Sequence, residues 1–252
     1  GTINHGTSNA NTPATFAVPS VTIPAGATLN LQGGASFEIY FNGNVTLNGT
    51  LDLGQDTITV NVAGHWTHNT GGALNNTTNS TVTLDGSGKE IRGTLAGGTG
   101  FYNLQVGGSL TLNNSAMAVT ATNNLTVAAA GTFNVSSGAV TVTQSVTNNG
   151  IINGGTGTLY VGNDFTDNQT FNAESGTVEF NTTTTSGDIG GTAPTTTFYN
   201  VTLNKVDNTD IIEILSKAVV VNGLLWIKLG QLNLASAQES LDLNGTPTSL
   251  KV

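Results

Sequence analysis

A short repeat in the middle of the chain constrains its fold more than any other feature. Between Gly131 and Asn181 the segment GTFNVSSGAVTVTQSVTNN is followed by two variants of itself, so that equivalent residues recur every 19 positions. Within each copy apolar and polar residues alternate, which is the period of a β-strand. Repeats this short that alternate in this way are typical of stacked β-coils, in which each coil contacts only its neighbours. The sequence therefore predicts an all-β fold, a parallel β-helix or β-solenoid.

Positions that keep an apolar residue at every step of the repeat are expected to point inward. Three such columns run through the three copies, and Phe165 falls in line with Val146. We assign Trp66 to the same interior, because its segment HWTHN resembles the segment DFTDN around Phe165. The predicted core columns are Phe133, Ile152 and Phe171; Val140, Leu159 and Val178; Val142, Val161 and Phe180; together with Trp66 and Phe165.

One polar column follows the same 19-residue step. Asn134, Asn153 and Asn172 each stand between apolar residues. Stacked amides can form hydrogen bonds along the axis of a solenoid, as asparagine ladders do in cross-β structures. We therefore predict a structural ladder here and favour it over a row of ligand-binding groups.

Each repeat contains three strands and three corners, which predicts a three-sided coil with little or no helix. The general rule for parallel crossover connections predicts a right-handed coil. Residues 1–20 lack the repeat and carry Pro13 and Pro19, so we expect them to form an N-terminal arm or cap. Residues 21–252 are expected to form one continuous solenoid.

A longer repeat overlies the short one. The segment FYNL at 101–104 returns as FYNV at 198–201, and STVTL at 80–84 resembles GTVEF at 176–180. These phrases divide the solenoid into a first module at about 44–123, a second at about 124–218, and a truncated third at 219–252.

The composition argues against two classes of partner, nucleic acids and membranes. Charged residues make up only 8% of the chain, and the formal net charge is −9, with six scattered Lys and Arg residues. Binding to phosphates requires clustered basic residues, so nucleic acid is not expected as a partner. No run of ~20 apolar residues is present, so membrane insertion is not expected either. The chain begins at Gly1 without a signal peptide, and we expect an export signal to have been removed, or the chain to have been trimmed.

No motif in the sequence predicts a catalytic residue, a metal site or a cofactor. His65 and His68 flank Trp66, but residues three apart on a strand face opposite sides and cannot chelate one ion. Acidic residues gather in two places, and such small groups are usually solvated loops. The two groups are Asp207, Asp210 and Glu213 near Lys205, and Asp164 with Asp167.

The last segment differs from the rest, because its strands are apolar on both faces. Strands of this kind are covered on both sides. We therefore predict a subunit contact here; a short helix over 224–229 and a local cap are the alternatives. The candidate contact residues are Ile211, Leu215, Val220, Leu224, Trp226 and Leu229.

The 19-residue coils resemble the right-handed β-helix of filamentous-haemagglutinin-type adhesins and autotransporter passengers. The longer module, with its phrases from Thr177 to Phe180 and from Phe198 to Leu203, resembles repeats of large bacterial surface proteins. The resemblance implies export, with a role in adhesion or scaffolding, and it implies no catalytic residue. We expect a non-enzymatic structural protein, extracellular or at the cell surface, whose copies assemble through the solenoid ends and the N-terminal arm into a filament or surface layer.

Two other functions stay open at this point. The chain could be a segment of a large cell-surface adhesin, with glycans as a further candidate partner. It could also be a polysaccharide-binding or polysaccharide-cleaving β-helix. That function would need aromatic platforms in one groove, and the candidates are Tyr40, Tyr102, Tyr160 and Tyr199.

Overall fold

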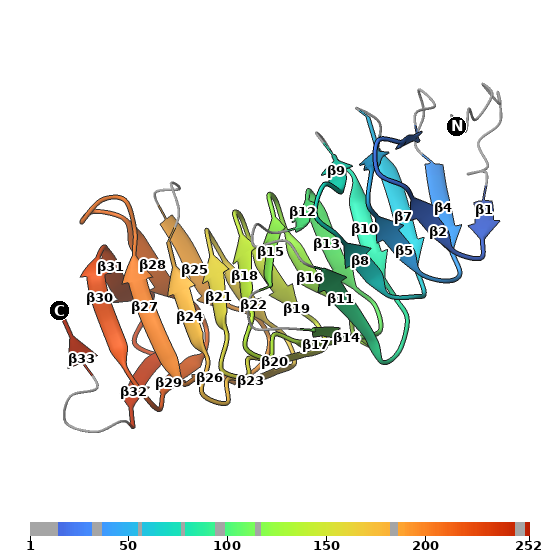
Figure 1. Ribbon diagram of the computed structural model, residues 1–252. Coiled ribbons are helices and arrows are strands. Elements are labelled where there is room, and N and C mark those ends of the chain that lie inside the picture. The colour runs from blue at the N-terminus through green and yellow to red at the C-terminus, as the bar shows by residue number, and fades with distance from the viewer. Residues whose placement is uncertain are drawn as a thin grey trace.

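The chain folds into a rod of stacked β-coils, with its first strand at one end and its last strand at the other (Figure 1). The computed structural model describes residues 15–31, 37–54, 57–76, 79–93, 99–113, 117–181, 186–244 and 250–252. All elements in these ranges are strands, and every pairing between them is parallel. The same ranges contain no helix that could cross a membrane. The predicted all-β parallel solenoid is therefore confirmed, while its right-handed sense stays a prediction.

Three long faces run along the rod, and successive strands of the chain visit them in turn. The first face is one sheet of eleven strands, paired in the order of the chain. These strands are β1 (Thr15–Val18), β4 (Phe37–Phe41), β7 (Ile58–Val62), β10 (Thr81–Leu84), β13 (Asn103–Val106), β16 (Leu125–Val127), β19 (Val146–Asn148), β22 (Phe165–Asp167), β25 (Ser186–Gly190), β28 (Ile211–Ile214) and β31 (Gln231–Leu234).

The second face consists of an eight-stranded sheet followed by a three-stranded sheet. The eight strands are β2 (Val21–Ile23), β5 (Val45–Leu47), β8 (Trp66–His68), β11 (Lys89–Gly93), β14 (Ser109–Leu112), β17 (Thr132–Asn134), β20 (Ile151–Asn153) and β23 (Thr170–Asn172). The other three are β26 (Thr195–Phe198), β29 (Ala218–Val221) and β32 (Ser240–Leu243).

The third face begins with a three-stranded sheet and continues as an eight-stranded one. The three strands are β3 (Thr28–Asn30), β6 (Thr50–Asp52) and β9 (Ala73–Asn75). The eight are β12 (Thr99–Phe101), β15 (Ala118–Ala121), β18 (Ala139–Val142), β21 (Thr158–Val161), β24 (Thr177–Phe180), β27 (Asn200–Asn204), β30 (Leu225–Leu229) and β33 (Leu250–Lys251). One strand from each face makes one coil, so the predicted three-sided coil is confirmed.

The coil length varies along the rod. Paired residues lie 19 positions apart at Val146 and Phe165, but 25 apart at Ile189 and Ile214. On the first face the nine steps from Ile39 to Leu234 span 195 residues, or about 22 per step. The 19-residue length therefore holds between β17 and β24 and is wrong as a general coil length. The variation is absorbed at the corners, because connecting segments on the surface tolerate insertions.

The interior is a continuous apolar column built by the alternation of inward and outward residues. All the predicted core residues are buried except Phe171, which is half-buried and packs against the core. Ring centroids of Phe165 lie 5.2 Å from Phe171 and 5.5 Å from Phe198, so aromatic rings from successive coils stack inside the rod. Burial of large side chains along the whole axis supplies the main favourable term for this fold.

The long sequence repeat is out of phase with the coil. The segment around Trp66 forms β8 on the second face, whereas the matching segment around Phe165 forms β22 on the first face. In the same way the STVTL segment contains β10 on the first face, and the GTVEF segment contains β24 on the third. Segments with matching sequences therefore both form strands, but these strands lie on different faces of the solenoid.

Two further sequence expectations meet the structure at the ends of the chain. Strand β1 begins at Thr15, inside the stretch expected to be an arm, and pairs with β4; residues 1–14 lie outside the described ranges. The helix considered over 224–229 is wrong, because β30 occupies Leu225–Leu229. The backbone is extended here because β30 pairs in parallel with β27 on the third face.

Candidate functional site

The most irregular place on the rod is a break in the second face. Strand β23 is the last of the eight-stranded sheet, and β26 is the first of the three-stranded sheet, so the ladder does not continue between them. The adjoining corner also shrinks. Four residues, 173–176, connect β23 to β24, whereas Tyr199 alone connects β26 to β27. A protruding corner therefore stands next to a flat one.

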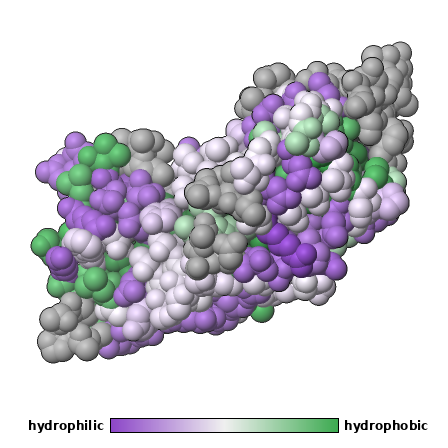
Figure 2. Space-filling view, viewed as in Figure 1, coloured by the Kyte–Doolittle hydropathy of each residue, from purple (hydrophilic) through white to green (hydrophobic). Residues whose placement is uncertain are grey.

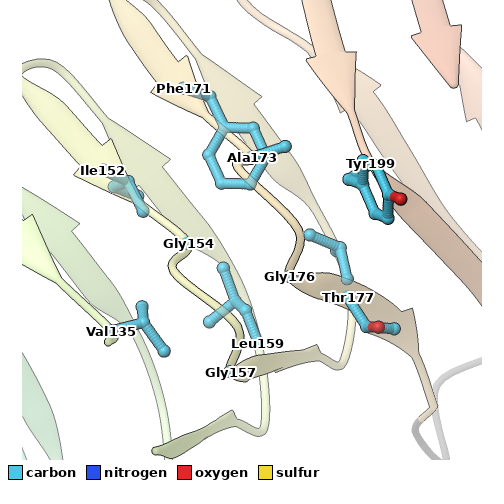
Figure 3. A pocket seen from close by; sticks show the side chains of 11 residues that line it. Val135, Ile152, Gly154, Gly157, Leu159, Phe171, Ala173, Gly176, Thr177 and Tyr199 are labelled. Carbon is cyan, nitrogen blue, oxygen red and sulfur yellow. The ribbon is translucent and has the colours of Figure 1, made fainter. Parts of the chain in front are cut away.

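The step between these two corners forms a notch, a hollow of about 540 Å³ that opens to solvent. An adjoining crevice of only about 10 Å³, lined mainly by apolar residues, lies where Phe171, Ala173 and Tyr199 project from neighbouring coils (Figure 3). Three successive coils supply the side chains around the notch, which include Phe171, Asn172, Glu174, Thr197, Tyr199 and Asn222.

The asparagine ladder ends at this notch. Asn134 Nδ2 donates to Thr111 Oγ1 at 3.0 Å, and Asn153 Nδ2 donates to Asn134 Oδ1 at 2.6 Å. Asn172 Nδ2 then donates to Asn153 Oδ1 at 2.8 Å. Every donor points toward the N-terminal coils, so Asn172 Oδ1 is left as the terminal acceptor, and no donor among the described residues reaches it. Chains of hydrogen bonds polarise one another, which strengthens a terminal acceptor.

A carboxylate stands beside that acceptor on a backbone conformation that suits glycine. Glu174 has a φ of 50°, and the residues one and two coils earlier, Gly155 and Ser136, have φ values of 62° and 58°. The corner therefore requires the left-handed region at each of these coils. That region costs a residue with a Cβ roughly 1–2 kcal/mol, and glycine avoids the cost. Glu174 is exposed at the notch, so its side chain gains nothing from burial there.

A buried polar cluster lies inside the same part of the rod. Asn148 and Asp167 occupy an inward column that holds Val127 one coil earlier. Asn148 Nδ2 donates to Asp167 Oδ1 at 2.9 Å, and Thr196 Oγ1 donates to Asp167 Oδ2 at 2.8 Å. Lys217 Nζ donates to the carbonyl oxygens of Asp167 and Gly190. The cluster satisfies its own hydrogen bonds, as buried polar groups must.

The sequence did not predict these burials, although one signal for them was available. Val146 and Phe165 point inward, so strand alternation places residues 148 and 167 inward as well. Asp167 was interpreted as part of a solvated loop, and this was wrong, because it is almost fully buried.

The acidic group near Lys205 is likewise not the solvated loop that the sequence suggested. Lys205 and Asp210 are buried, and Lys205 Nζ donates to the carbonyl oxygen of Gly162 at 3.0 Å. Burial lowers the pKa of Lys205, and the charges of Asp210 and Asp164 oppose this shift. Of the three acidic residues in this group only Asp207 is exposed, and its carboxylate accepts hydrogen bonds from Thr209. The corner is therefore held by a buried ammonium group.

Three carboxylates lie in line on the outside of the first face. Asp188 is the register partner of Glu213, and the Asp188 backbone N–H donates to Asp164 Oδ1 at 3.1 Å. Partial burial raises the pKa of Asp188, and the charges of Asp164 and Glu213 raise it further. No set of three His, Cys, Asp or Glu side chains in the described part of the chain is placed to hold a metal ion.

The two histidines beside Trp66 face different ways. His65 Nδ1 accepts from the backbone N–H of Glu90, and His65 Nε2 lies 3.2 Å from an Arg92 guanidinium nitrogen. His68 is buried, with Nε2 at 2.8 Å from the carbonyl oxygen of Gly72. Burial lowers the pKa of His65, and the positive charge of Arg92 lowers it further. The two side chains therefore serve separate structural contacts.

The predicted subunit-contact residues do not form one patch. Ile211 and Leu215 lie at the two ends of β28 on the first face, Val220 lies on the second, and Trp226 on the third. Leu224 belongs to the corner before β30, and Leu229 ends that strand. Lys228 and Lys251 place their ammonium groups 4.3 and 4.0 Å from the Trp226 ring. One flat contact through all six residues is therefore geometrically excluded.

Exposed apolar residues gather instead on the last coil. Leu234, Leu243 and Leu250 are 49%, 37% and 51% exposed. Their register partners one coil earlier, Ile214, Val221 and Leu225, are all buried, so the three leucines extend the inward columns of the three faces. The space-filling view shows hydrophobic residues at this end of the rod (Figure 2).

The four tyrosines considered as platforms do not share a groove. Tyr40 lies on β4 of the first face, and Tyr160 on β21 of the third. Tyr102 occupies the corner between β12 and β13, and Tyr199 the corner at the notch. Tyr199 lines both the notch and the crevice beside it.

Comparison with known proteins found no relative of this chain. No protein-family model, no curated protein and no solved structure matches it.

Proposed function

We propose that this chain is a non-enzymatic structural protein, acting outside the cell or at its surface, whose copies stack end to end into a filament or surface layer. The observation that carries the proposal is the apolar face of the last coil, where Leu234, Leu243 and Leu250 continue the inward columns into solvent. The occupant we propose for this face is the first coil of a second copy.

The geometry of the two ends supports head-to-tail stacking. Each of the three faces begins with one of β1, β2 and β3 and ends with one of β31, β32 and β33. A second copy placed in the same direction would therefore extend all three faces by parallel pairing. Contacts of this heterologous kind do not close on themselves and generate filaments.

The first coil also offers apolar side chains at matching positions. Val18, Val21 and Leu29 are the register partners of the buried Phe41, Val45 and Leu51, and each packs against the core from a partly exposed position. Covering a leucine completely stabilises a contact by roughly 1.5–3 kcal/mol relative to full exposure. The three half-exposed leucines would thus contribute a few kcal/mol, and pairing of the open strand edges would add to this.

Sedimentation velocity over a range of protein concentrations, with electron microscopy of the same samples, tests the proposal. Head-to-tail stacking predicts oligomers that lengthen with concentration. The double variant Leu234→Asp, Leu243→Asp should shorten them by at least an order of magnitude, because two charges would be buried without partners. The matched control is Ile151→Asp, since Ile151 is 38% exposed on β20, in the middle of the rod. Assembly that is equally strong in both variants would contradict the proposal.

The alternative function, a segment of a large surface adhesin, predicts a different result. In that case the coil that covers β31 to β33 would belong to the same polypeptide, and residues 1–252 by themselves would sediment as a monomer at every concentration. Purified protein that is monomeric and folded would therefore favour the adhesin segment over the self-assembling subunit.

A further inference from the structure

We infer that the notch between β23 and β26 binds a neutral saccharide. The inference concerns the side of the rod and not its ends, so it stands or falls separately from the end-to-end assembly. Its basis is the chemistry of the side chains that three successive coils bring to one hollow.

The notch combines aromatic rings with hydrogen-bonding groups. Tyr199 is 39% exposed, and Phe171 is half-buried beside it. A pyranose ring has one face of C–H groups and a rim of hydroxyls, so it needs an apolar surface together with polar partners. Ligand sites of this type are concave, with apolar and aromatic walls and a few placed polar groups, and they measure about 300–1,000 Å³. The notch, at about 540 Å³, lies within that range.

The polar groups of the notch favour a ligand that donates hydrogen bonds. Asn172 Oδ1 is the terminal acceptor of the asparagine ladder, and the exposed Glu174 carboxylate stands two residues further on. A carboxylate only accepts hydrogen bonds, and each sugar hydroxyl can donate one. Thr197 and Asn222 add groups that both donate and accept. The lining therefore suits hydroxyl groups on adjacent carbons.

The charge of the site selects against acidic sugars. The lining includes the acidic residue Glu174, the chain carries a net charge of −9, and none of the described residues that line the notch is basic. A uronic acid or a sulfated sugar would bring a second negative charge against Glu174 with no cation to offset it. The ligand class is thus a neutral saccharide.

Glu174 provides a second line of support. Its corner conformation suits glycine, and the coil before it has Gly155 at the equivalent place. Here a carboxylate occupies a position where the backbone gains from having no side chain. Ser136 has the same backbone conformation two coils away from the notch, which makes it the matched control.

The experiment measures binding of neutral oligosaccharides to the full chain by isothermal titration calorimetry and by amide chemical shifts in NMR spectra. The probes are cellotetraose, maltotetraose, mannotriose and chitotetraose, with tetragalacturonate as the anionic comparison. We expect at least one neutral probe to shift the amide signals of Asn172, Glu174 and Tyr199, and the anionic probe to leave them unchanged.

The variants separate binding from folding. Tyr199→Ala should weaken the association constant at least tenfold, whereas Tyr160→Ala, which removes a tyrosine from the outside of β21, should not change it. Glu174→Gly should weaken binding while the midpoint of thermal unfolding stays the same or rises. Ser136→Gly should leave the association constant unchanged.

Three results would overturn the inference. The first is that none of the neutral probes shifts the signals of the notch at millimolar concentration. The second is that a probe binds with the same association constant to wild type and Glu174→Gly, which keeps the test valid even if Tyr199→Ala unfolds. The third is that tetragalacturonate binds the notch more tightly than the neutral probes.

Discussion

Between β17 and β24 neighbouring strands step by 19 residues, whereas from β25 onward the steps on the first face are 25 and 20. In the regular part the inward positions of β17, β18, β20 and β21 are apolar, and the corners are alike. In the later part Lys205 and Lys217 are buried and donate to main-chain carbonyls near the corners. In the regular part the corners are alike because the sequence repeats. In the irregular coils the corners differ, and buried lysine ammonium groups bind their carbonyl oxygens.

The comparison also explains where the two proposed sites lie. Where coils repeat without change, each outward column is covered by similar neighbours above and below. A hollow forms where the corner changes length, at Tyr199, and an apolar face opens where stacking stops, at β31 to β33. Both proposed contact sites therefore lie at departures from regularity.

The largest expected difference between the regular part and the last coil is in the stability that is lost when an inward side chain is truncated. Phe133→Ala, in the regular part, should lower the free energy of unfolding by about 3–5 kcal/mol, because a fully buried ring leaves a cavity. Leu232→Ala, in the last coil, should cost about 1 kcal/mol, because this side chain is only partly buried. Urea unfolding followed by circular dichroism measures both. Similar costs at the two positions would show that the last coil is covered in solution.

A smaller contrast concerns the buried ammonium of Lys217. Burial lowers its pKa in the folded chain, against the opposing charge of Asp167. Above that lowered pKa the unfolded chain binds more protons than the folded one, so the free energy of unfolding rises with pH toward the ordinary lysine value. In Lys217→Met this rise should shrink. The variant should be about 1–3 kcal/mol less stable than wild type at pH 9.5, because two buried carbonyls lose their donor.

Urea titrations at pH 7 and pH 9.5 test this expectation. The control is Lys228→Met, which removes an exposed lysine from the third face. If the difference between Lys217→Met and wild type is the same at both pH values, the ammonium is not buried as described.

The smallest effect concerns the acidic column on the first face. The column holds Asn124 and Ser145 in earlier coils and continues as Asp164, Asp188 and Glu213. The pKa of Asp188 is raised in the folded chain, so stability falls as pH rises through that pKa. Asp188→Asn should therefore stabilise the protein at pH 7 by about 0.2–1 kcal/mol, the range for a like-charge pair across strands.

The gain from Asp188→Asn should disappear at pH 3, where the carboxyl is protonated in both states. Differential scanning calorimetry at the two pH values provides the measurement. Asp242→Asn is the control, because Asp242 is exposed on the last coil. A gain that is equal at both pH values would contradict the electrostatic explanation.

Several parts of the molecule follow from the sequence directly. The alternation in the repeat identifies the inward columns, and Phe133, Ile152 and Val140 are fully buried as expected. Nor did the ladder of Asn134, Asn153 and Asn172 need a structure to be foreseen, since one residue type recurs at one step. These features depend only on the period of a strand and on one constant coil length.

Other parts depend on corners whose lengths add up along the chain. Trp66 and Phe165 have matching neighbours in the sequence, yet they lie on different faces, because the intervening corners differ in length. For the same reason the apolar residues from Ile211 to Leu229 lie on three faces and do not form one patch. No short segment of the sequence shows the summed length of the corners before it, so it does not show on which face a strand lies.

The lengths of the coils thus determine which residues become neighbours in successive coils. The sequence by itself determined a three-sided β-solenoid, its apolar interior and its asparagine ladder, because a two-residue period is a property of the extended backbone alone. Only the folded chain shows that the ladder ends at the notch that Tyr199 lines, that Lys205 and Lys217 are buried, and that three leucines are exposed on the last coil. Those outcomes depend on which coils are adjacent, and adjacency across a corner is not local in sequence.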